Sequence, residues 1–255
     1  MGSVQWEGAA RTAFAHLSQG GLLKPTGLLD LLSPTMNDFW PAAVGSTGAD
    51  YLAATEVRSL LMQLSIERAA HPVADDHDLA LDMVTTLGYM PGSGGKPPRY
   101  GGVDRVQVRS AGIEGGPVHA TWTAWWLWFR IGPRGIEVLH EPAPQVLVDQ
   151  DDALDSPLPV PRMDAADVAS RFRWSSRETD MNNHVFFLSY PQRAENALAD
   201  AGIDTSALHR WRAWFVRPSF LHEAMTAEIA RDGDGWMVAL RNDARDEAAA
   251  YVRGE

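Results

Sequence analysis

The segment TDMNNHVFF, residues 179–187, places an acid, amides and an imidazole directly before a run of apolar residues. Side chains alternate in an extended chain, so Asp180, Asn182 and His184 would point to the same side. The apolar run from Val185 predicts a helix, and the first N–H groups of a helix are unpaired and carry partial positive charge. Together these groups can activate a water molecule and stabilise an oxyanion. The segment therefore indicates a site that could hydrolyse an acyl bond.

The same residues also have a purely structural interpretation. Asp180 and Asn182 are residue types that cap helices, and His184 could be a surface or core histidine. The three residue types at this spacing do not decide between the two interpretations, so both stay open at this point.

The elements around the segment must position it. Residues 170–178 predict a strand, residues 185–202 a helix and residues 210–220 a further strand. We expect Gly202 to end the helix and Pro191 to kink it, because proline removes a backbone donor. Two further segments follow, a hairpin over residues 225–243 with an Asp-Gly turn and a strand over residues 247–254.

The first part of the chain shows a similar pattern. Val57, Leu60, Leu61 and Leu64 follow the spacing of a helix face, and this helix should end at His71-Pro72. The strands predicted after it cover residues 103–110, 118–131 and 136–141.

Each half thus combines one long helix with antiparallel strands. This pattern predicts an α+β fold in which a curved antiparallel sheet wraps around a helix, made twice. We expect an N-terminal extension of short helices or a lid over residues 1–45, a first unit over 46–140, a linker rich in Pro and Asp over 141–168, and a second unit over 169–255.

The segment HATWTAWWLWFR, residues 119–130, holds several of the 10 tryptophans. Alternation along a strand puts Trp122, Trp126 and Trp128 on one face and Trp125 on the other. Such clusters line pockets or interfaces, and they also occur in strands that are packed on both faces. We expect the face with three tryptophans to form a pocket wall.

The composition excludes several classes of protein. The chain has no cysteine, so it has no disulfide framework, no cysteine nucleophile and no cysteine-ligated metal. The net charge of −11 disfavours nucleic acid as a partner. We find no signal peptide and no apolar run long enough for a membrane span, so we expect a cytoplasmic protein. The histidine spacing favours no metal site.

Residues 173–190, RWSSRETDMNNHVFFLSY, resemble the signature of the acyl-acyl-carrier-protein thioesterases, which have a hotdog fold and are related to the 4-hydroxybenzoyl-CoA thioesterases. Asp180, Asn182, His184 and Tyr190 keep the spacing of that signature. Residues 48–73 are similar to the central helix of the first half of these enzymes. The resemblance extends over roughly residues 48–252 and implies a double hotdog, with the functional residues in the second half.

The resemblance also implies roles for individual residues. Asp180, Asn182 and His184 correspond to active-site positions, and Glu195 lies one residue from the position of a further catalytic glutamate. Where the family has two asparagines, this chain has Phe186 and Phe187, which is a departure that reshapes the site. The substrate-binding residues that we expect are Trp122, Trp126, Trp128, Phe186, Phe187, Tyr190 and Ser219.

The resulting hypothesis is a thioesterase that hydrolyses an acyl-carrier-protein or acyl-CoA thioester to the free acid. Asp180 or His184 would activate the water, and main-chain N–H groups near residues 184–186 would hold the oxyanion. Two alternatives stay open: a hotdog enzyme of dehydratase or cyclase type that acts on a tethered thioester, and a non-catalytic acyl-binding protein. We expect no cofactor and no membrane partner, and either a pseudo-dimeric monomer or a homodimer.

Overall fold

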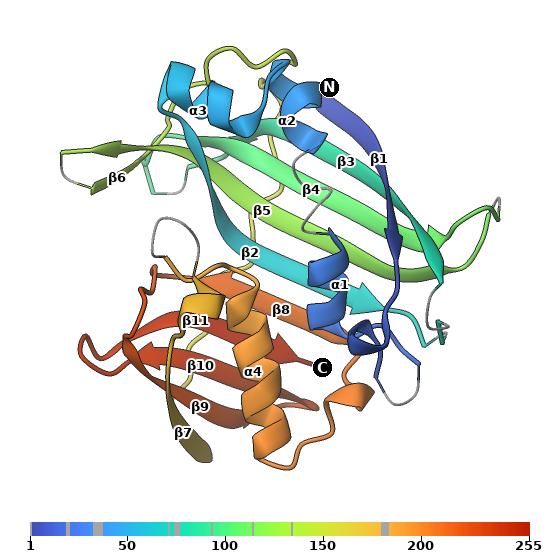
Figure 1. Ribbon diagram of the computed structural model, residues 1–255. Coiled ribbons are helices and arrows are strands. Elements are labelled where there is room, and N and C mark those ends of the chain that lie inside the picture. The colour runs from blue at the N-terminus through green and yellow to red at the C-terminus, as the bar shows by residue number, and fades with distance from the viewer. Residues whose placement is uncertain are drawn as a thin grey trace.

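The computed structural model describes residues 2–18, 21–32, 38–70, 72–73, 77–92, 94–113, 115–133, 135–179 and 184–255. Its centre is an 11-stranded antiparallel sheet with the strand order β1-β3-β4-β5-β2-β8-β11-β10-β9-β7, and β6 pairs with β5 (Figure 1). Strands from both halves of the chain therefore belong to the same sheet.

The strands are β1 (Ser3–Arg11), β2 (Arg58–Arg68), β3 (Asp78–Met90), β4 (Arg99–Ser110), β5 (Val118–Gly132), β6 (Gly135–Val138), β7 (Val168–Arg173), β8 (Arg210–Phe215), β9 (Ala224–Asp232), β10 (Gly235–Asn242) and β11 (Glu247–Gly254). The α-helices are α1 (Pro25–Leu32), α2 (Phe39–Val44), α3 (Gly48–Thr55) and α4 (Ser189–Asp200). The described part of the chain also includes the short 3-10 helices η1 (Phe14–His16), η3 (Ser176–Glu178) and η4 (Thr205–Ala207).

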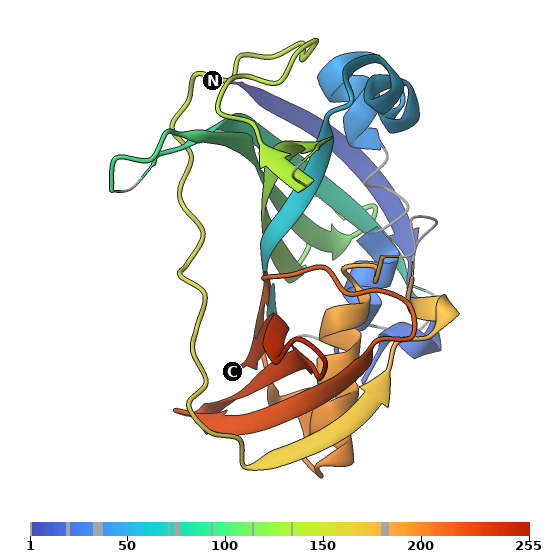
Figure 2. The same cartoon turned by 90° about the vertical axis from the view of Figure 1, so that its left-hand side faces the viewer.

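The helices lie on one side of the sheet, and the chain between β6 and β7 runs along the other side (Figure 2). Helix α4 packs against β9, β10 and β11, and α1 contacts both α4 and β1. On the opposite side, Leu154 of the connecting chain packs with Met90 and Leu127. Helices therefore cover one face of the sheet, and an extended segment runs along the other.

The two halves meet where β2 pairs with β8, in a register that runs from Gln63 opposite Trp214 to Glu67 opposite Arg210. The largest core cluster crosses this junction, since it includes Leu64 from the first half and Trp211 from the second. Burial of apolar side chains is the main force that stabilises such a core, so the junction is part of the folded core of the protein.

Several predicted elements are confirmed. The strands predicted over residues 103–110, 118–131 and 247–254 correspond to β4, β5 and β11, and the hairpin at 225–243 corresponds to β9 and β10. Gly202 follows the end of α4 with a φ of 77°, a left-handed conformation that glycine adopts without strain.

The predicted helix that contains Val57, Leu60, Leu61 and Leu64 is wrong, because these residues lie at the start of β2 and within it. A β-bulge between Leu61 and Gln63 shifts the alternation of the strand by one residue. Because of the bulge, the apolar residues of this strand are spaced three and four positions apart, which is also the spacing of a helix face. The counterpart of a long central helix in the first half is therefore missing at this position, and the short helices α1, α2 and α3 cover that half of the sheet (Figure 1).

Two further strands were not predicted. Strand β1 lies within residues 1–45, where we expected only short helices or a lid, and it pairs with β3 from Ser3 to Arg11. Strand β3 alternates cleanly, with Leu79, Leu81 and Met83 buried, so its period-two pattern was available in the sequence.

Helix α4 begins at Ser189, four residues later than predicted. Pro191 is therefore the third residue of the helix, where the backbone N–H has no partner within the helix in any case. Proline fits this first turn without a kink, so Pro191 gives no reason to expect the kink that we predicted.

Candidate functional site

The acid and the amide of the predicted site, Asp180 and Asn182, lie outside the described residues, and His184 is the first residue described after them. The structure shows how the chain is held on both sides of the segment. Thr179 and Val185 face each other in an isolated antiparallel bridge. The chain therefore returns to nearly the same place after residues 180–184.

The main-chain carbonyl of Glu178 strengthens this closure. It accepts hydrogen bonds from the N–H of Phe186 at 2.8 Å and from Oγ of Ser189 at 3.1 Å. The chain before residues 180–183 is thereby bonded to the chain after them and to the first residue of α4.

The side chain of Glu178 anchors the same point from the other direction. Its carboxylate accepts from the N–H of Ser175 at 2.9 Å and from Oγ of Ser175 at 2.8 Å, and it forms an ion pair with Arg193 of α4. Burial by itself would raise the pKa of Glu178, but the hydrogen bonds from Ser175 and the Arg193 guanidinium lower that pKa below its ordinary value. Arg193 also lies 4.6 Å from the ring centre of Phe172.

Glu178 and Arg193 were not predicted as positioning residues. Residues 175–178 read Ser-Ser-Arg-Glu, which is the capping-box pattern of a serine followed three residues later by a glutamate. That signal was present in the sequence and marks the turn that carries the site.

His184 is partly buried and is held by the loop between β8 and β9. It faces Phe220 in an antiparallel bridge, and the two ring centres are 4.9 Å apart in an edge-to-face arrangement. The next residue donates its N–H to the carbonyl of Ser219 at 2.8 Å. The imidazole thus packs on this loop, and the backbone beside it is bonded to the same loop.

The predicted oxyanion donors near residues 184–186 need correction. The N–H of Val185 is bonded to the carbonyl of Ser219, and the N–H of Phe186 is bonded to the carbonyl of Glu178. These residues form a short bridge of extended chain and do not form the first turn of a helix. The prediction is therefore wrong for these two N–H groups, because neither is available to a ligand.

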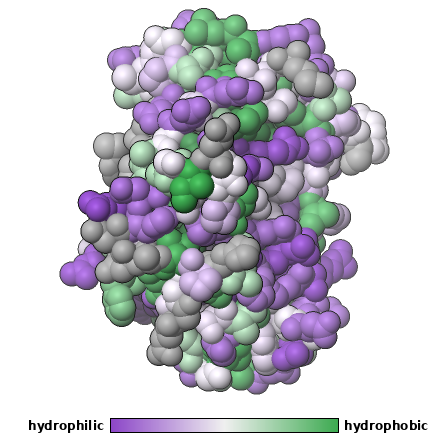
Figure 3. All heavy atoms as spheres, turned by 90° about the vertical axis from the view of Figure 1, so that its right-hand side faces the viewer, coloured by the Kyte–Doolittle hydropathy of each residue, from purple (hydrophilic) through white to green (hydrophobic). Residues whose placement is uncertain are grey.

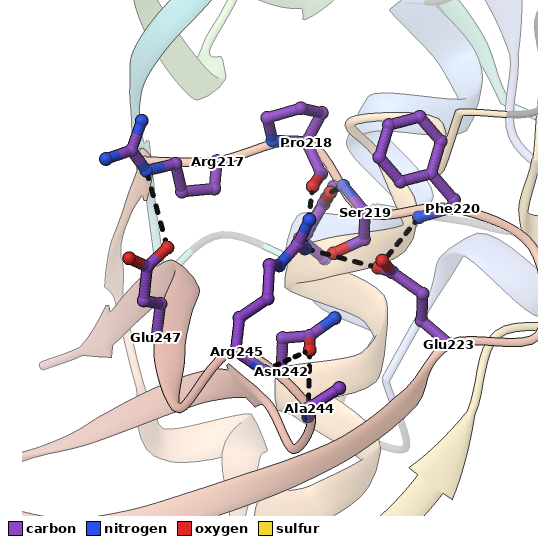
Figure 4. A network of polar contacts seen from close by, with 10 residues as sticks. Arg217, Pro218, Ser219, Phe220, Glu223, Asn242, Ala244, Arg245 and Glu247 are labelled. Carbon is purple, nitrogen blue, oxygen red and sulfur yellow. Dashed lines mark hydrogen bonds and ion pairs between the residues drawn. The ribbon is translucent and has the colours of Figure 1, made fainter.

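The loop between β8 and β9 is itself built on polar contacts (Figure 4). Arg245 donates to the carbonyl of Pro218 at 3.1 Å and contacts the Glu223 carboxylate at 3.3 Å. The same carboxylate accepts from the N–H of Phe220 at 3.0 Å. Arg217 forms an ion pair with Glu247 at 3.7 Å. The backbone that faces His184 is thus held by Arg245 and Glu247, which lie outside this loop.

Two of the predicted substrate-binding residues, Tyr190 and Ser219, contact each other in this region. The N–H of Ser219 donates to Oη of Tyr190 at 3.0 Å, and both residues are buried. Burial raises the pKa of Tyr190 above its ordinary value, so this hydroxyl stays protonated near neutral pH. Their arrangement connects α4 to the loop beside His184.

The two phenylalanines after His184 have different surroundings. Phe186 is 36% exposed, and its ring centre is 4.7 Å from that of Phe187. Phe187 packs against the main core and lies 6.4 Å from Phe215 of β8. Phe186 is therefore the more accessible of the two to a ligand.

Glu195 lies at the contact between α4 and α1. Its carboxylate accepts a hydrogen bond from Oγ1 of Thr26 at 2.7 Å. Burial lowers the pKa of Arg68, and the negative charge of Glu195 partly opposes this shift. The Arg68 guanidinium donates to the carbonyls of Leu208 and Leu23. Glu195 thus belongs to a polar contact between the two halves of the chain.

The tryptophans of β5 alternate as predicted. Trp122 belongs to the main core, and Trp126 and Trp128 belong to an aromatic cluster with Phe39 on the helix side of the sheet. Trp125 packs on the opposite face. The three inner tryptophans are almost fully buried, and the role of a pocket wall that we assigned to them stays a prediction.

In the described parts of the chain, no group of three His, Asp or Glu side chains is placed to hold a metal ion. None of the described helices is long and apolar enough to cross a membrane. The face of the molecule seen in Figure 3 is mixed, with small apolar patches between polar and charged residues.

No protein-family model matches this chain, and no curated protein matches it in sequence. Solved structures do match it over nearly its whole length. An acyl-ACP thioesterase from Bacteroides thetaiotaomicron has a TM-score of 0.72 at 11% identity and covers 98% of this chain and 96% of its own. The 12:0-ACP thioesterase from Umbellularia californica has a TM-score of 0.73 at 11% identity, with 98% and 96% covered.

The chain has a hotdog fold. Another class of enzyme is also similar in structure. A MaoC-like dehydratase from Phytophthora capsici matches this chain with a TM-score of 0.58 at 14% identity, and the match covers 99% of this chain and 95% of the dehydratase. At sequence identities this low, the similarity to these structures shows a shared fold and does not show a shared function.

Proposed function

We propose that the protein hydrolyses an acyl thioester to the free acid with an activated water molecule. The observation that carries the proposal is the position of His184. It is a partly buried imidazole at the end of an Asp-x-Asn-x-His segment, and the chain on both sides of that segment is fixed by the Thr179–Val185 bridge and by Glu178. A general base acts efficiently only when its geometry is held in this way.

The reaction needs one proton acceptor and one set of oxyanion donors. Either His184 or Asp180 removes a proton from water as the water oxygen attacks the thioester carbonyl. The tetrahedral intermediate then expels the thiolate, which takes the proton from the same group. Asn182 orients the water or the carboxylate. The oxyanion is stabilised by donors other than the bonded N–H groups of Val185 and Phe186.

The comparisons favour hydrolysis over the other chemistry of this fold. The two thioesterase structures match with TM-scores of 0.72 and 0.73, and the dehydratase matches with 0.58. The substrate class that fits is an acyl group on a carrier protein or on CoA. Glu195 is a further catalytic candidate, on the helix that follows His184.

We also propose that the chain is a double hotdog, with a first unit over residues 46–140, a linker over 141–168 and the catalytic unit over 169–255. Helix α4 lies across β9, β10 and β11 as the central helix of the second unit. The acyl chain would lie against the helix-covered face of the first unit, near Trp122, Trp126 and Trp128, and Phe186 and Phe187 would border its thioester end.

The second candidate is a dehydratase-type reaction on a tethered thioester, and the dehydratase neighbour favours it. His184 and Asp180 would then act as an acid and base pair, and the product would stay attached to its carrier. A third candidate is an acyl-binding protein without turnover, which the unusual Phe186-Phe187 pair would suit.

The test is the release of free thiol from a panel of acyl-CoA and acyl-carrier-protein thioesters. We expect release by the parent protein, with a loss of at least about 100-fold in Asp180→Ala and in His184→Ala, the usual size of a general-base contribution. The matched controls are Asp200→Ala and His209→Ala, which remove the same groups at exposed positions.

The possible results separate the three candidate functions. Release that is equal in all variants would overturn the proposed site. A modified acyl group that is still attached to its carrier, identified by mass spectrometry, would favour the dehydratase type. Binding of the thioesters without any change in them would favour the acyl-binding protein.

A further inference from the structure

An acidic residue, Asp104, lies in the middle of the helix-covered face of the sheet, away from the site described above. It belongs to β4 and stands opposite Thr85 of β3 and Ala124 of β5. On the same face, Trp122 of the main core lies on one side of it and Trp126 of the aromatic cluster lies on the other. A carboxylate is costly in apolar surroundings unless it is hydrogen-bonded.

Two donors hold this carboxylate, and both reach the same oxygen. Oγ1 of Thr85 donates to Oδ1 at 2.6 Å, and Nε1 of Trp126 donates to Oδ1 at 3.0 Å. The indole can reach Asp104 because residue 102 on β4 is a glycine. A Cβ atom at Gly102 would lie 2.4 Å from the Trp126 ring, so any larger residue would displace the indole.

The second oxygen, Oδ2, receives no hydrogen bond from any residue that the structure describes. Asp104 nevertheless keeps part of its surface accessible. Burial raises the pKa of Asp104 to about 6, so the group is mostly ionised near neutral pH. The arrangement leaves one oxygen of a fixed carboxylate without a hydrogen bond.

The register of the sheet places Asp104 in a row of mostly short side chains. From β1 to β8, the row consists of Val4, Thr85, Asp104, Ala124, Leu64 and Ala213. A neighbouring row is bulky and consists of Met83, Val106, Trp122, Ile66 and Trp211. The short row therefore crosses the sheet beside a ridge of large side chains.

The row continues from β8 onto β11, and at Ala213 of β8 it passes near the proposed catalytic residues. Phe215 lies two residues after Ala213, and its ring centre is 5.7 Å from Tyr190 and 6.4 Å from Phe187. Phe187 follows His184 by three residues. On the proposed function, an acyl chain whose thioester is at His184 would follow this row from β8 towards Asp104.

We propose that Asp104 determines substrate specificity by accepting a hydrogen bond from a hydroxyl group on the acyl chain. The substrate class is thus a hydroxyacyl thioester. The inference rests on the proposed hydrolase function, since it places the acyl chain of that substrate. A fixed acceptor that a plain acyl chain leaves unpaired discriminates against that chain, and it repels a group that can only accept.

The experiment compares three series of straight-chain acyl-CoA thioesters of equal length: unsubstituted, with one hydroxyl, and with one oxo group, placed at successive carbons. For the parent we expect one hydroxyl position whose kcat/KM exceeds that of the unsubstituted chain by about tenfold or more. The oxo group at the same carbon should be the poorest substrate, because it offers no donor to Oδ2.

Asp104→Asn replaces the acceptor at the Oδ2 position with a donor. The amide carbonyl can still accept from Thr85 and Trp126, and the NH₂ group then replaces Oδ2 as a donor. The variant should therefore gain activity on the oxo substrate relative to the hydroxyl substrate, by about tenfold or more. Asp82→Asn is the matched control, an exposed aspartate on β3 whose change should leave the order of substrates unaltered.

Equal kcat/KM for the three series in the parent would overturn the specificity role and leave the hydrolase function intact. This comparison needs no variant, so it holds even if Asp104→Asn does not fold. If the parent releases no thiol from any thioester, the hydrolase function fails. Calorimetric binding of the matching free acids then decides the role of Asp104, and equal affinity for all three would overturn it.

Discussion

At the scale of single residues, the site depends on side chains that hold others in place. Glu178 uses its carboxylate for Ser175 and Arg193, and its carbonyl for Phe186 and Ser189. The proposed reactive groups were chosen by residue type and spacing, since an Asp-x-Asn-x-His segment is visible in the sequence. Which backbone donors are already occupied could not be found, because the partners of Val185 and Phe186 are set by a loop more than thirty residues away and by a turn.

Glu178→Gln should lower both stability and activity. The change leaves the half-buried Arg193 without its counter-charge, and hydrogen bonds to charged groups contribute about 1.5–3 kcal/mol. The folded pKa of Glu178 lies below its ordinary value, so its contribution is present above the unfolded pKa and is lost as the pH falls through the folded pKa. Urea unfolding at pH 7 and at pH 3 measures this difference.

The exposed Glu7→Gln on β1 serves as the control, with no change expected. A Glu178→Gln variant that is as stable as the parent at pH 7 would show that the Arg193 contact does not hold the turn.

Asp104 should have the opposite pH dependence. Its pKa rises from 3.8 to about 6 in the folded protein, so the folded state binds more protons than the unfolded state between these values. Its ionisation therefore costs stability as the pH rises through that window, by up to about 3 kcal/mol in total. Relative to the parent, Asp104→Asn should become more stable between pH 4 and pH 7, as measured by urea unfolding. A difference that is constant with pH would contradict the raised pKa.

At the scale of elements, predictability followed the regularity of each strand. The hairpin of β9 and β10 has an Asp-Gly turn and could be predicted from local signals. Strand β2 could not, because the bulge at Leu61 and Gln63 changes its period and only the pairing with β5 and β8 reveals it. The start of α4 was also missed, since residues 185–188 have the apolar character of a helix but are bonded to other parts of the chain.

The contact between α4 and the loop after β8 gives a prediction at this scale. Tyr190→Phe removes the acceptor of the buried N–H of Ser219, and an unsatisfied buried donor costs about 1–3 kcal/mol. We expect this loss in urea unfolding, together with a lower kcat, because the loop also positions His184. Tyr251→Phe, on β11, is the control of the same type. Unchanged stability and unchanged kcat would show that the hydroxyl does not fix the loop.

At the scale of the whole molecule, the two halves share a sheet and a core. The β2–β8 pairing and the Thr26–Glu195 hydrogen bond both cross between them. The α+β class could be predicted from the sequence, because antiparallel strand signals and one helix are local. The joining of the halves into a continuous sheet could not, since it depends on pairing between residues about 150 positions apart.

The shared core predicts that the halves unfold together. Tryptophans occur in both halves, at Trp122 and Trp211 for example, and report on the same cluster. Urea unfolding followed by tryptophan fluorescence and by far-ultraviolet circular dichroism should therefore give coincident transitions. Two separate transitions would show that the halves are independent units joined by a weak contact.

The central claim is that His184 belongs to a hydrolytic site. The most direct measurement is thiol release from acyl thioesters by the parent, by His184→Ala and by the exposed control His209→Ala, with the fold of each verified by circular dichroism. We expect His184→Ala to lower kcat/KM by at least about 100-fold and the control to match the parent. Equal thiol release by all three proteins would contradict it.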